Sequence, residues 1–157
     1  MTQSNKYAFV EQMGSFFERI GQPKIAGLLF GHLLICNPPK QSAAQLQKAV
    51  SASVGSVNTM LRLLQTSGFI ERRSEAGSRK QWYWISPGAF SKVLSKRMQL
   101  ISELKNLAEA GLSEIDQNEN TPVGQRLREM KDCYSFFEIE FPALIDKYQS
   151  MKEANHE

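Results

Sequence analysis

The chain has 157 residues, of which 41% are hydrophobic and 22% charged, as is typical of one compact globular domain with helical extensions. The amino terminus lacks a basic segment followed by an apolar one, and the most apolar run, residues 25–36, is too short to span a bilayer. We therefore expect a cytoplasmic protein with no membrane association. With two histidines, no phosphate-binding glycine loop and no nucleophile motif, the sequence predicts no enzyme, no catalytic residue and no cofactor.

The charge is distributed unevenly along the chain. Residues 40–105 carry eleven lysines and arginines against three glutamates, whereas residues 106–157 carry five cations against eleven acids. A concentrated basic segment favours association with a polyanion, and a solvated surface is the alternative explanation.

Apolar spacing predicts two helices before residue 39. Phe9, Met13, Phe16 and Ile20 recur at intervals of four, three and four, which indicates an amphipathic helix that ends near residues 21–23. We expect this stripe to pack in a dimer core, with a ligand-pocket lining as the alternative. The second helix, residues 24–36, is apolar on nearly all sides and should be buried.

Residues 42–66 predict a helix-turn-helix. Ser42 is a good N-cap for a short first helix, and Ser53 is a good N-cap for a second helix, in which Val57, Leu61 and Leu64 repeat at helical spacing. The opposite face of the second helix carries small, polar or cationic groups that suit a major groove. With the cap and a flanking serine, the expected DNA contacts on this helix are Ser53, Gly55, Ser56, Asn58, Thr59 and Arg62.

A basic hairpin follows the second helix. Ser67 and Gly68 predict the helix end, and residues 69–73 and 81–85 are rich in aromatic and β-branched residues, which indicates two strands. The polar loop between them would be a wing. On this hairpin the expected DNA contacts are Arg72, Arg73, Ser78, Arg79 and Lys80.

The last 70 or so residues predict two long helices. Pro87 can open the first, and Pro122 the second, after a polar break at residues 116–121. In the last helix nine apolar residues are spaced alternately four and three residues apart, which is a heptad seam. Such a seam can pair with another helix within the subunit or between subunits. Pro142 should cause a kink or a break in this helix. The nine apolar residues are Val123, Leu127, Met130, Tyr134, Phe137, Phe141, Leu144, Tyr148 and Met151. The expected dimer residues are Phe9, Met13, Phe16, Leu127, Tyr134, Phe137 and Phe141.

Several motifs resemble a known family. Ser53-x-Gly55-Ser56-Val57, Gly68-Phe69-Ile70-Glu71-Arg72 and Gly77-x-Arg79-Lys80 resemble the MarR-type regulators, in the branch named for the repressor of glycine-betaine synthesis (GbsR-like), as do Gly21-x-Pro23-Lys24 and Asn37-Pro38-Pro39 upstream. The resemblance implies a dimeric DNA-binding regulator, often a repressor, and an osmolyte effector such as choline or betaine. Val54 departs from the pattern, because members commonly carry a cation there.

The expected fold is mainly α with a small β-hairpin wing: a winged helix-turn-helix at residues 40–86, N-terminal helices at 1–39 and C-terminal dimerisation helices at 87–157. The expected function is a ligand-responsive repressor that binds double-stranded DNA at a palindromic operator as a homodimer. Rings that could contribute to a choline cage, each of them equally an ordinary core candidate, are Phe16, Phe17, Phe30, Trp82, Tyr83 and Trp84.

Two hypotheses from other classes stay open. A winged helix can bind a protein instead of DNA, and the discriminating feature is whether the cations of the second helix and the hairpin share one face. A redox or metal sensor would use Cys36, one helical turn from His32, or Cys133, which are the only cysteines.

Overall fold

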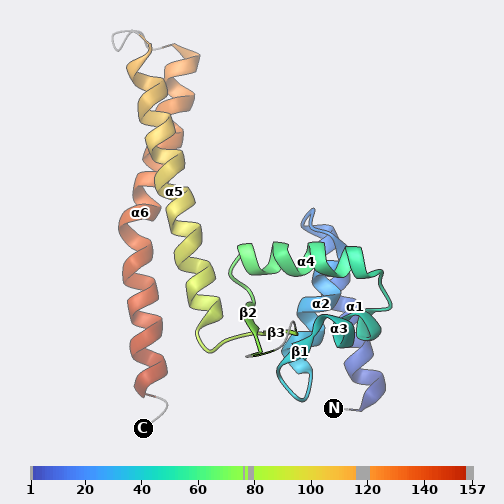
Figure 1. Cartoon of the computed structure of the whole chain (residues 1–157). Helices are drawn as coiled ribbons and strands as arrows, with labels where there is room; N and C mark the ends of the chain where they lie inside the picture. Colours follow the sequence, from blue (N-terminus) through green and yellow to red (C-terminus); the bar gives the residue numbers. More distant parts are fainter. Residues whose placement is uncertain (1, 76, 78–79, 116–120, 155–157) are drawn as a thin grey trace. The chain divides into compact units, whose positions relative to one another are not determined.

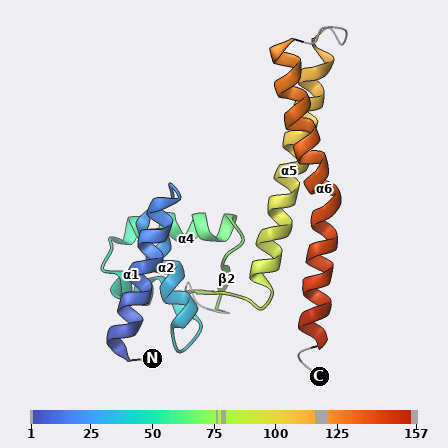
Figure 2. The same cartoon turned by 180° about the vertical axis from the view of Figure 1, so that it is seen from behind.

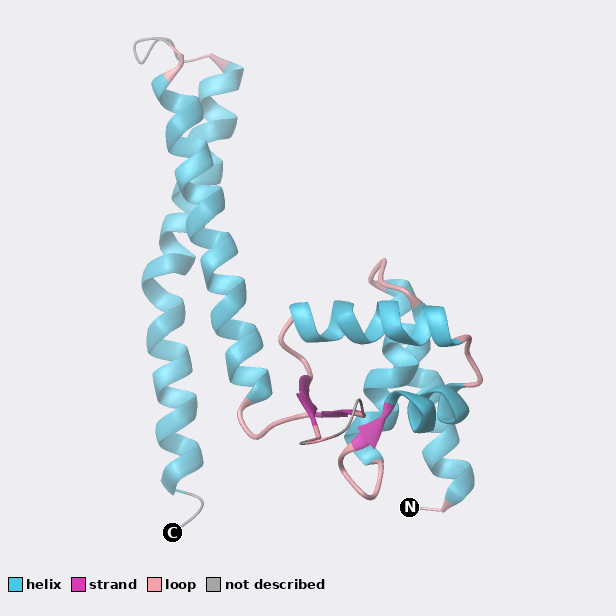
Figure 3. Cartoon of the chain, viewed as in Figure 1, coloured by secondary structure: helices cyan, strands magenta, loops and turns pink. Residues whose placement is uncertain are grey.

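The computed structural model describes residues 2–75, 77, 80–115 and 121–154. It confirms a mainly helical fold with a small antiparallel sheet (Figures 1 and 3). The elements are α1 Gln3–Arg19, α2 Lys24–Ile35, β1 Gln41–Ser42, α3 Ala43–Val50, α4 Val54–Thr66, β2 Glu71–Ser74, β3 Gln81–Trp84, α5 Ala89–Ser113 and α6 Pro122–Ala154. No helix among the described residues is both long enough and apolar enough to cross a membrane.

The chain forms two compact units, residues 1–90 and 91–157. In the first, α2 contacts α1, α3 and α4 and so occupies the centre. The side chains that are almost fully excluded from solvent there are Leu29, Leu46, Val57, Leu61 and Leu64. The N-terminal helices and the winged helix-turn-helix therefore share one hydrophobic core.

Helices α1 and α2 lie side by side at unusually short range (Figure 2). A Cβ atom added to Gly27 would lie 2.5 Å from the carbonyl oxygen of Met13 and 2.8 Å from the Cα of Gly14. One added to Gly31 would lie 2.9 Å from the Cβ of Met13. The glycines thus allow backbone to pack on backbone, which positions α1 against the helix-turn-helix.

Local capping defines the helix-turn-helix as the sequence predicts. Ser42 and Gln45 form a reciprocal capping box at the start of α3, and the Ser53 hydroxyl accepts from the amide of Ser56 at the start of α4. Between the two helices, Ser51 adopts a left-handed conformation with φ of 51°. The tight turn that the motif requires is therefore formed by a non-glycine residue.

The end of α4 is a Schellman motif, which shifts the first wing strand. Gly68 has φ of 83°, its amide donates to Gln65, and the amide of Phe69 donates to Leu64. The expected strand over residues 69–73 begins instead at Glu71, because Phe69 serves the cap and Ile70 is buried in the core.

The sheet has three strands in the order β1-β3-β2, all antiparallel. The two-residue strand β1 pairs Gln41 with Tyr83 and Ser42 with Trp82. It is too short for sequence periodicity to reveal, and it ties the start of the helix-turn-helix to the wing.

Pro87 does not open α5, contrary to expectation. The amide of Ala89 donates to the carbonyl of Ser86, and Gly88 has φ of 78°. Proline followed by a positive-φ glycine is typical of a type II turn, so α5 begins after the turn, at Ala89.

In the second unit, α5 and α6 run antiparallel and side by side (Figures 1 and 2). Lys105 and Glu138 form an ion pair across them at 2.6 Å, and Gly111 faces Leu127. Helix α6 continues through Pro142, so the alternative of a break there is wrong. A proline removes only one backbone hydrogen bond of the ladder, and the turns on both sides keep theirs.

Candidate nucleic-acid interface

Helix α4 presents one buried face and one exposed face. Its stripe of Val57, Leu61 and Leu64 is buried to 1% exposure each. The expected DNA contacts Gly55, Asn58, Thr59 and Arg62 are all exposed, and Ser56 is half-buried on the flank. Arg62 forms no ion pair with any described residue, so its guanidinium donors are available to an external acceptor.

The Ser53 hydroxyl is occupied by the cap. It accepts from the amide of Ser56 at 3.1 Å and donates to the Ser56 hydroxyl at 2.8 Å. Ser53 therefore orients the first turn of α4, and the hydroxyl of Ser56 is the better placed of the two for an external contact.

The wing cations do not all share one face. Neighbouring residues of a strand point to opposite faces, and directly paired residues of antiparallel strands share a face. Arg73 pairs with Trp82, whereas Arg72 pairs with Tyr83, whose side chain is buried in the core. Arg73 and Arg72 therefore cannot approach a ligand through the same face of the ribbon.

A tryptophan organises the base of the wing. The ammonium of Lys80 lies 4.1 Å from the ring centre of Trp82, and the Trp82 indole N–H donates to a carboxylate oxygen of Glu75 at 3.4 Å. With Arg73 opposite Trp82, these groups gather on one face of the hairpin. Ser78 and Arg79, which the sequence also assigns to DNA contact, lie outside the described residues.

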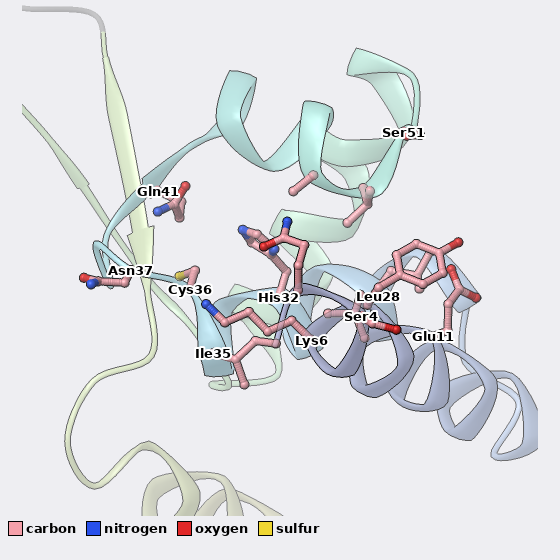
Figure 4. Close-up of a pocket in the computed structure, with 15 residues that line it drawn as sticks. Ser4, Lys6, Glu11, Leu28, His32, Ile35, Cys36, Asn37, Gln41 and Ser51 are labelled. Atoms are coloured by element: carbon pink, nitrogen blue, oxygen red, sulfur yellow. The ribbon is translucent and has the colours of Figure 1, made fainter. Parts of the chain in front are cut away.

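The first unit also contains a cavity of about 770 Å³ between α1, α2 and the end of α3 (Figure 4). Its apolar walls include Val10, Leu28 and Val50, and its polar groups include Lys6, His32 and Gln41. No sequence motif marks this cavity, because its lining residues come from separate elements.

Two groups in the cavity wall have shifted pKa values. Burial lowers the pKa of His32, and the nearby positive charge of Lys6 lowers it further. Burial raises the pKa of the Cys36 thiol, which disfavours the reactive thiolate. Among the described residues no group of three His, Cys, Asp or Glu side chains is placed to hold a metal ion, so His32 and Cys36 lack a third ligand.

The six rings considered for a choline cage do not converge on one site. Phe17 and Phe30 are buried core residues that pack on each other with ring centres 5.8 Å apart. Trp84 and Trp82 each lie under a lysine of this chain, Lys40 and Lys80 respectively. The alternative role as core residues therefore holds for Phe17 and Phe30, and both tryptophans already contact a cation of this chain.

The expected dimer residues fall into two sets. Leu127, Tyr134 and Phe141 on α6 are half-buried, and so are Phe9 and Met13 on α1. In contrast, Phe16 and Phe137 are 45% and 43% exposed. The exposed part of the heptad seam consists of Val123, Phe137, Leu144, Tyr148 and Met151.

Comparisons with known proteins agree with this geometry. A family model for MmpR5-like MarR family transcriptional regulators matches residues 88–151. The HTH-type transcriptional regulator MmpR5 of Mycobacterium tuberculosis is 39% identical over 140 residues, which cover 89% of this chain and 84% of the relative. A crystal structure described as a transcriptional regulator aligns with a TM-score of 0.84 at 36% identity, covering 93% of this chain and 99% of that one.

Proposed function

The chain belongs to the MmpR5-like MarR family of transcriptional regulators, and from that premise we propose that it binds double-stranded DNA as a homodimer through α4 and the wing. It is a DNA-binding regulator, and its relatives are regulators rather than enzymes. The family model names the MmpR5-like branch, so the glycine-betaine branch and its osmolyte effector are not confirmed.

The observation that carries the proposal is the exposed face of α4. Thr59 and Arg62 lie on this exposed face, and Asn58 lies at its edge. The opposite face of the helix is buried in the core. A helix with a buried anchor and a polar, cationic outer face can enter a major groove, where arginine donates to the O6 and N7 atoms of guanine. The same face offers little to a protein partner, because the residues at its centre, Gly55, Thr59 and Arg62, are small, polar or cationic and provide no large apolar anchor.

The first prediction concerns Arg62. Arg62→Ala should weaken binding to a site selected from a random duplex pool by about 1–3 kcal/mol, since a bidentate contact to guanine is lost. A matched control is Arg126→Ala, which removes an exposed arginine of α6 in the other unit. Gel-shift titration gives both affinities, and equal affinity of the Arg62 variant and wild type would exclude Arg62 as a base contact.

Homodimer formation gives the operator its symmetry. Two copies of α4 related by a two-fold axis would contact half-sites about 10 bp apart, so the operator would be an imperfect palindrome. The exposed apolar stripe of α6 supports pairing, because an apolar surface of this kind is rarely left in water. A DNA-binding role also supports a cytoplasmic location.

We place effector binding in the cavity of the first unit. The cavity lies between α1, which we expect to take part in the dimer, and the end of α3 in the helix-turn-helix. A molecule bound there would shift the helix-turn-helix, and with it α4, relative to the dimer helices. A repressor would then release its operator. Beside its apolar walls the cavity presents a cation, a carboxylate and an imidazole, from Lys6, Glu11 and His32 respectively.

A cavity-filling variant tests this placement. Ser4 lines the cavity from α1, and Gln12 is an exposed residue of the same helix outside the lining. Molecules that release wild-type protein from DNA should fail on Ser4→Trp and still act on Gln12→Trp. Equal release of both variants would place the effector elsewhere.

A further inference from the structure

Six glycines lie inside helices, and five of them are explained by a close neighbour. The nearest atom to an added Cβ lies at 2.5–3.2 Å for Gly14, Gly27, Gly31, Gly111 and Gly124. At Gly55, in the first turn of α4, an added Cβ would meet nothing within 4 Å. All six positions belong to the part of the chain that the structure describes.

Packing within the chain therefore does not require glycine at position 55. A helical glycine is less favourable than alanine, because it costs more backbone entropy on folding. Its backbone conformation is not a reason either, since Gly55 is not among the residues with positive φ. Neither packing nor backbone conformation within the described part of this subunit accounts for glycine at position 55.

Gly55 occupies the centre of the exposed face of α4. At about 100° per residue, Gly55, Thr59 and Arg62 lie close together, opposite the buried stripe of Val57, Leu61 and Leu64. The bare backbone at Gly55 thus adjoins the two side chains that we assign to base contact.

The preceding residue adds an apolar group beside this bare backbone. Val54 begins α4, and its side chain is 59% exposed. It is absent from the hydrophobic core of the first unit. Val54 lies about 100° around the helix from Gly55, but in the same first turn, so its exposed branched side chain offers a shallow apolar surface for a methyl group at this end of α4.

We propose that Gly55 is the point of closest approach between α4 and the operator, and that Val54 contacts the C5-methyl group of a thymine there. The inference rests on the proposed DNA-binding function. In the major groove only thymine presents a methyl group, and apolar contact with it is one of the direct modes of base recognition. A methyl group on residue 55 would occupy the space that the base edge fills.

The steric part is tested by Gly55→Ala. Binding to the selected site should weaken at least tenfold, while the thermal midpoint stays the same or rises, because alanine favours the helix. Gly124→Ala is the matched control, because it makes the same change in a helix outside the proposed DNA interface. Its added Cβ would lie 3.1 Å from Arg128 and 3.2 Å from Ile115, both ends of side chains, and DNA affinity should stay at the wild-type level.

Arg62→Ala separates this inference from the proposed function. If Arg62→Ala weakens binding and Gly55→Ala does not, the close approach is overturned while DNA binding through α4 stands. If neither variant weakens binding, the proposed interface itself is overturned. If both variants weaken binding, and the thermal midpoint of Gly55→Ala is unchanged or higher, the result supports both the proposed DNA interface and the close approach at Gly55.

The thymine contact is tested on the DNA. Each thymine of the selected site is replaced in turn by uracil, which lacks only the methyl group. Wild-type protein should lose about fourfold in affinity at one position per half-site, the equivalent of one buried methyl group. Val54→Ala should be insensitive to that replacement, and equal sensitivity of wild type and variant at every position would overturn the contact.

Discussion

His32 shows how a single residue links burial to stability. Burial and the charge of Lys6 lower its pKa in the folded protein, whereas an unfolded histidine titrates near 6.5. The unfolded chain therefore binds a proton more readily than the folded one does. The contribution of His32 to the free energy of unfolding is fully present above pH 6.5 and is lost as the pH falls below that value toward the folded pKa.

The corresponding prediction is that His32→Gln makes stability less sensitive to mild acid. Urea unfolding of wild type and variant at about pH 7.5 and about pH 5.5 measures the two differences. Wild type should lose more stability between these values than the variant does. If wild type and variant lose the same free energy of unfolding between these pH values, groups other than His32 cause the acid sensitivity.

Sequence reasoning succeeded at residues whose role is local. Ser42, Ser53 and Gly68 cap helices through contacts within a few residues, so their spacing is sufficient evidence. The sequence left alternatives open where tertiary contacts decide. Phe17 and Phe30 were candidates both for a ligand cage and for the core, and they lie in the core. Arg72 and Arg73 are adjacent and alike in sequence, and only their strand partners show that they point to opposite faces.

At the scale of elements, the α1–α2 pair depends on glycine. Gly27→Ala should lower the free energy of unfolding by about 1–3 kcal/mol, because the added methyl group meets backbone atoms that cannot move independently. Thermal unfolding at constant protein concentration measures the effect. Gly55→Ala is the matched control and should not lower the midpoint, since its methyl group meets only open space.

A midpoint for Gly27→Ala at or above that of wild type would show that α1 and α2 can separate at little cost. Helix α1 would then not be held firmly in the hydrophobic core that it shares with the helix-turn-helix.

The long helices show what periodicity reveals and what it does not. The alternation by four and three predicted α6 correctly, because an amphipathic stripe is a property of the helix itself. The spacing could not show whether the stripe packs on α5 of the same chain or on a second subunit. Leu127 faces Gly111 of α5 within the chain, whereas Leu144 is 60% exposed.

For the whole molecule, the exposed part of the seam predicts the dimer. Phe137→Glu combined with Leu144→Glu places charges on the apolar surface and should lower the dimer fraction while leaving the α5–α6 pair intact. Sedimentation at several concentrations measures the fraction. Glu140→Ala, at an exposed polar position of α6, is the control and should remain dimeric.

DNA binding should fall together with the dimer, since the two half-site contacts are then no longer linked. A monomeric double variant that binds the selected site as tightly as wild type would break the connection between pairing and DNA binding.

Dimeric binding to DNA requires that two copies of α4 contact one operator. A hydroxyl-radical footprint of wild-type protein on the selected site tests it most directly. Two protected segments related by a two-fold axis, with centres about 10 bp apart, are expected, and with Arg62→Ala both should weaken at a protein concentration near the wild-type Kd. A single unsymmetrical footprint, or a symmetrical one that Arg62→Ala leaves unchanged, would contradict it.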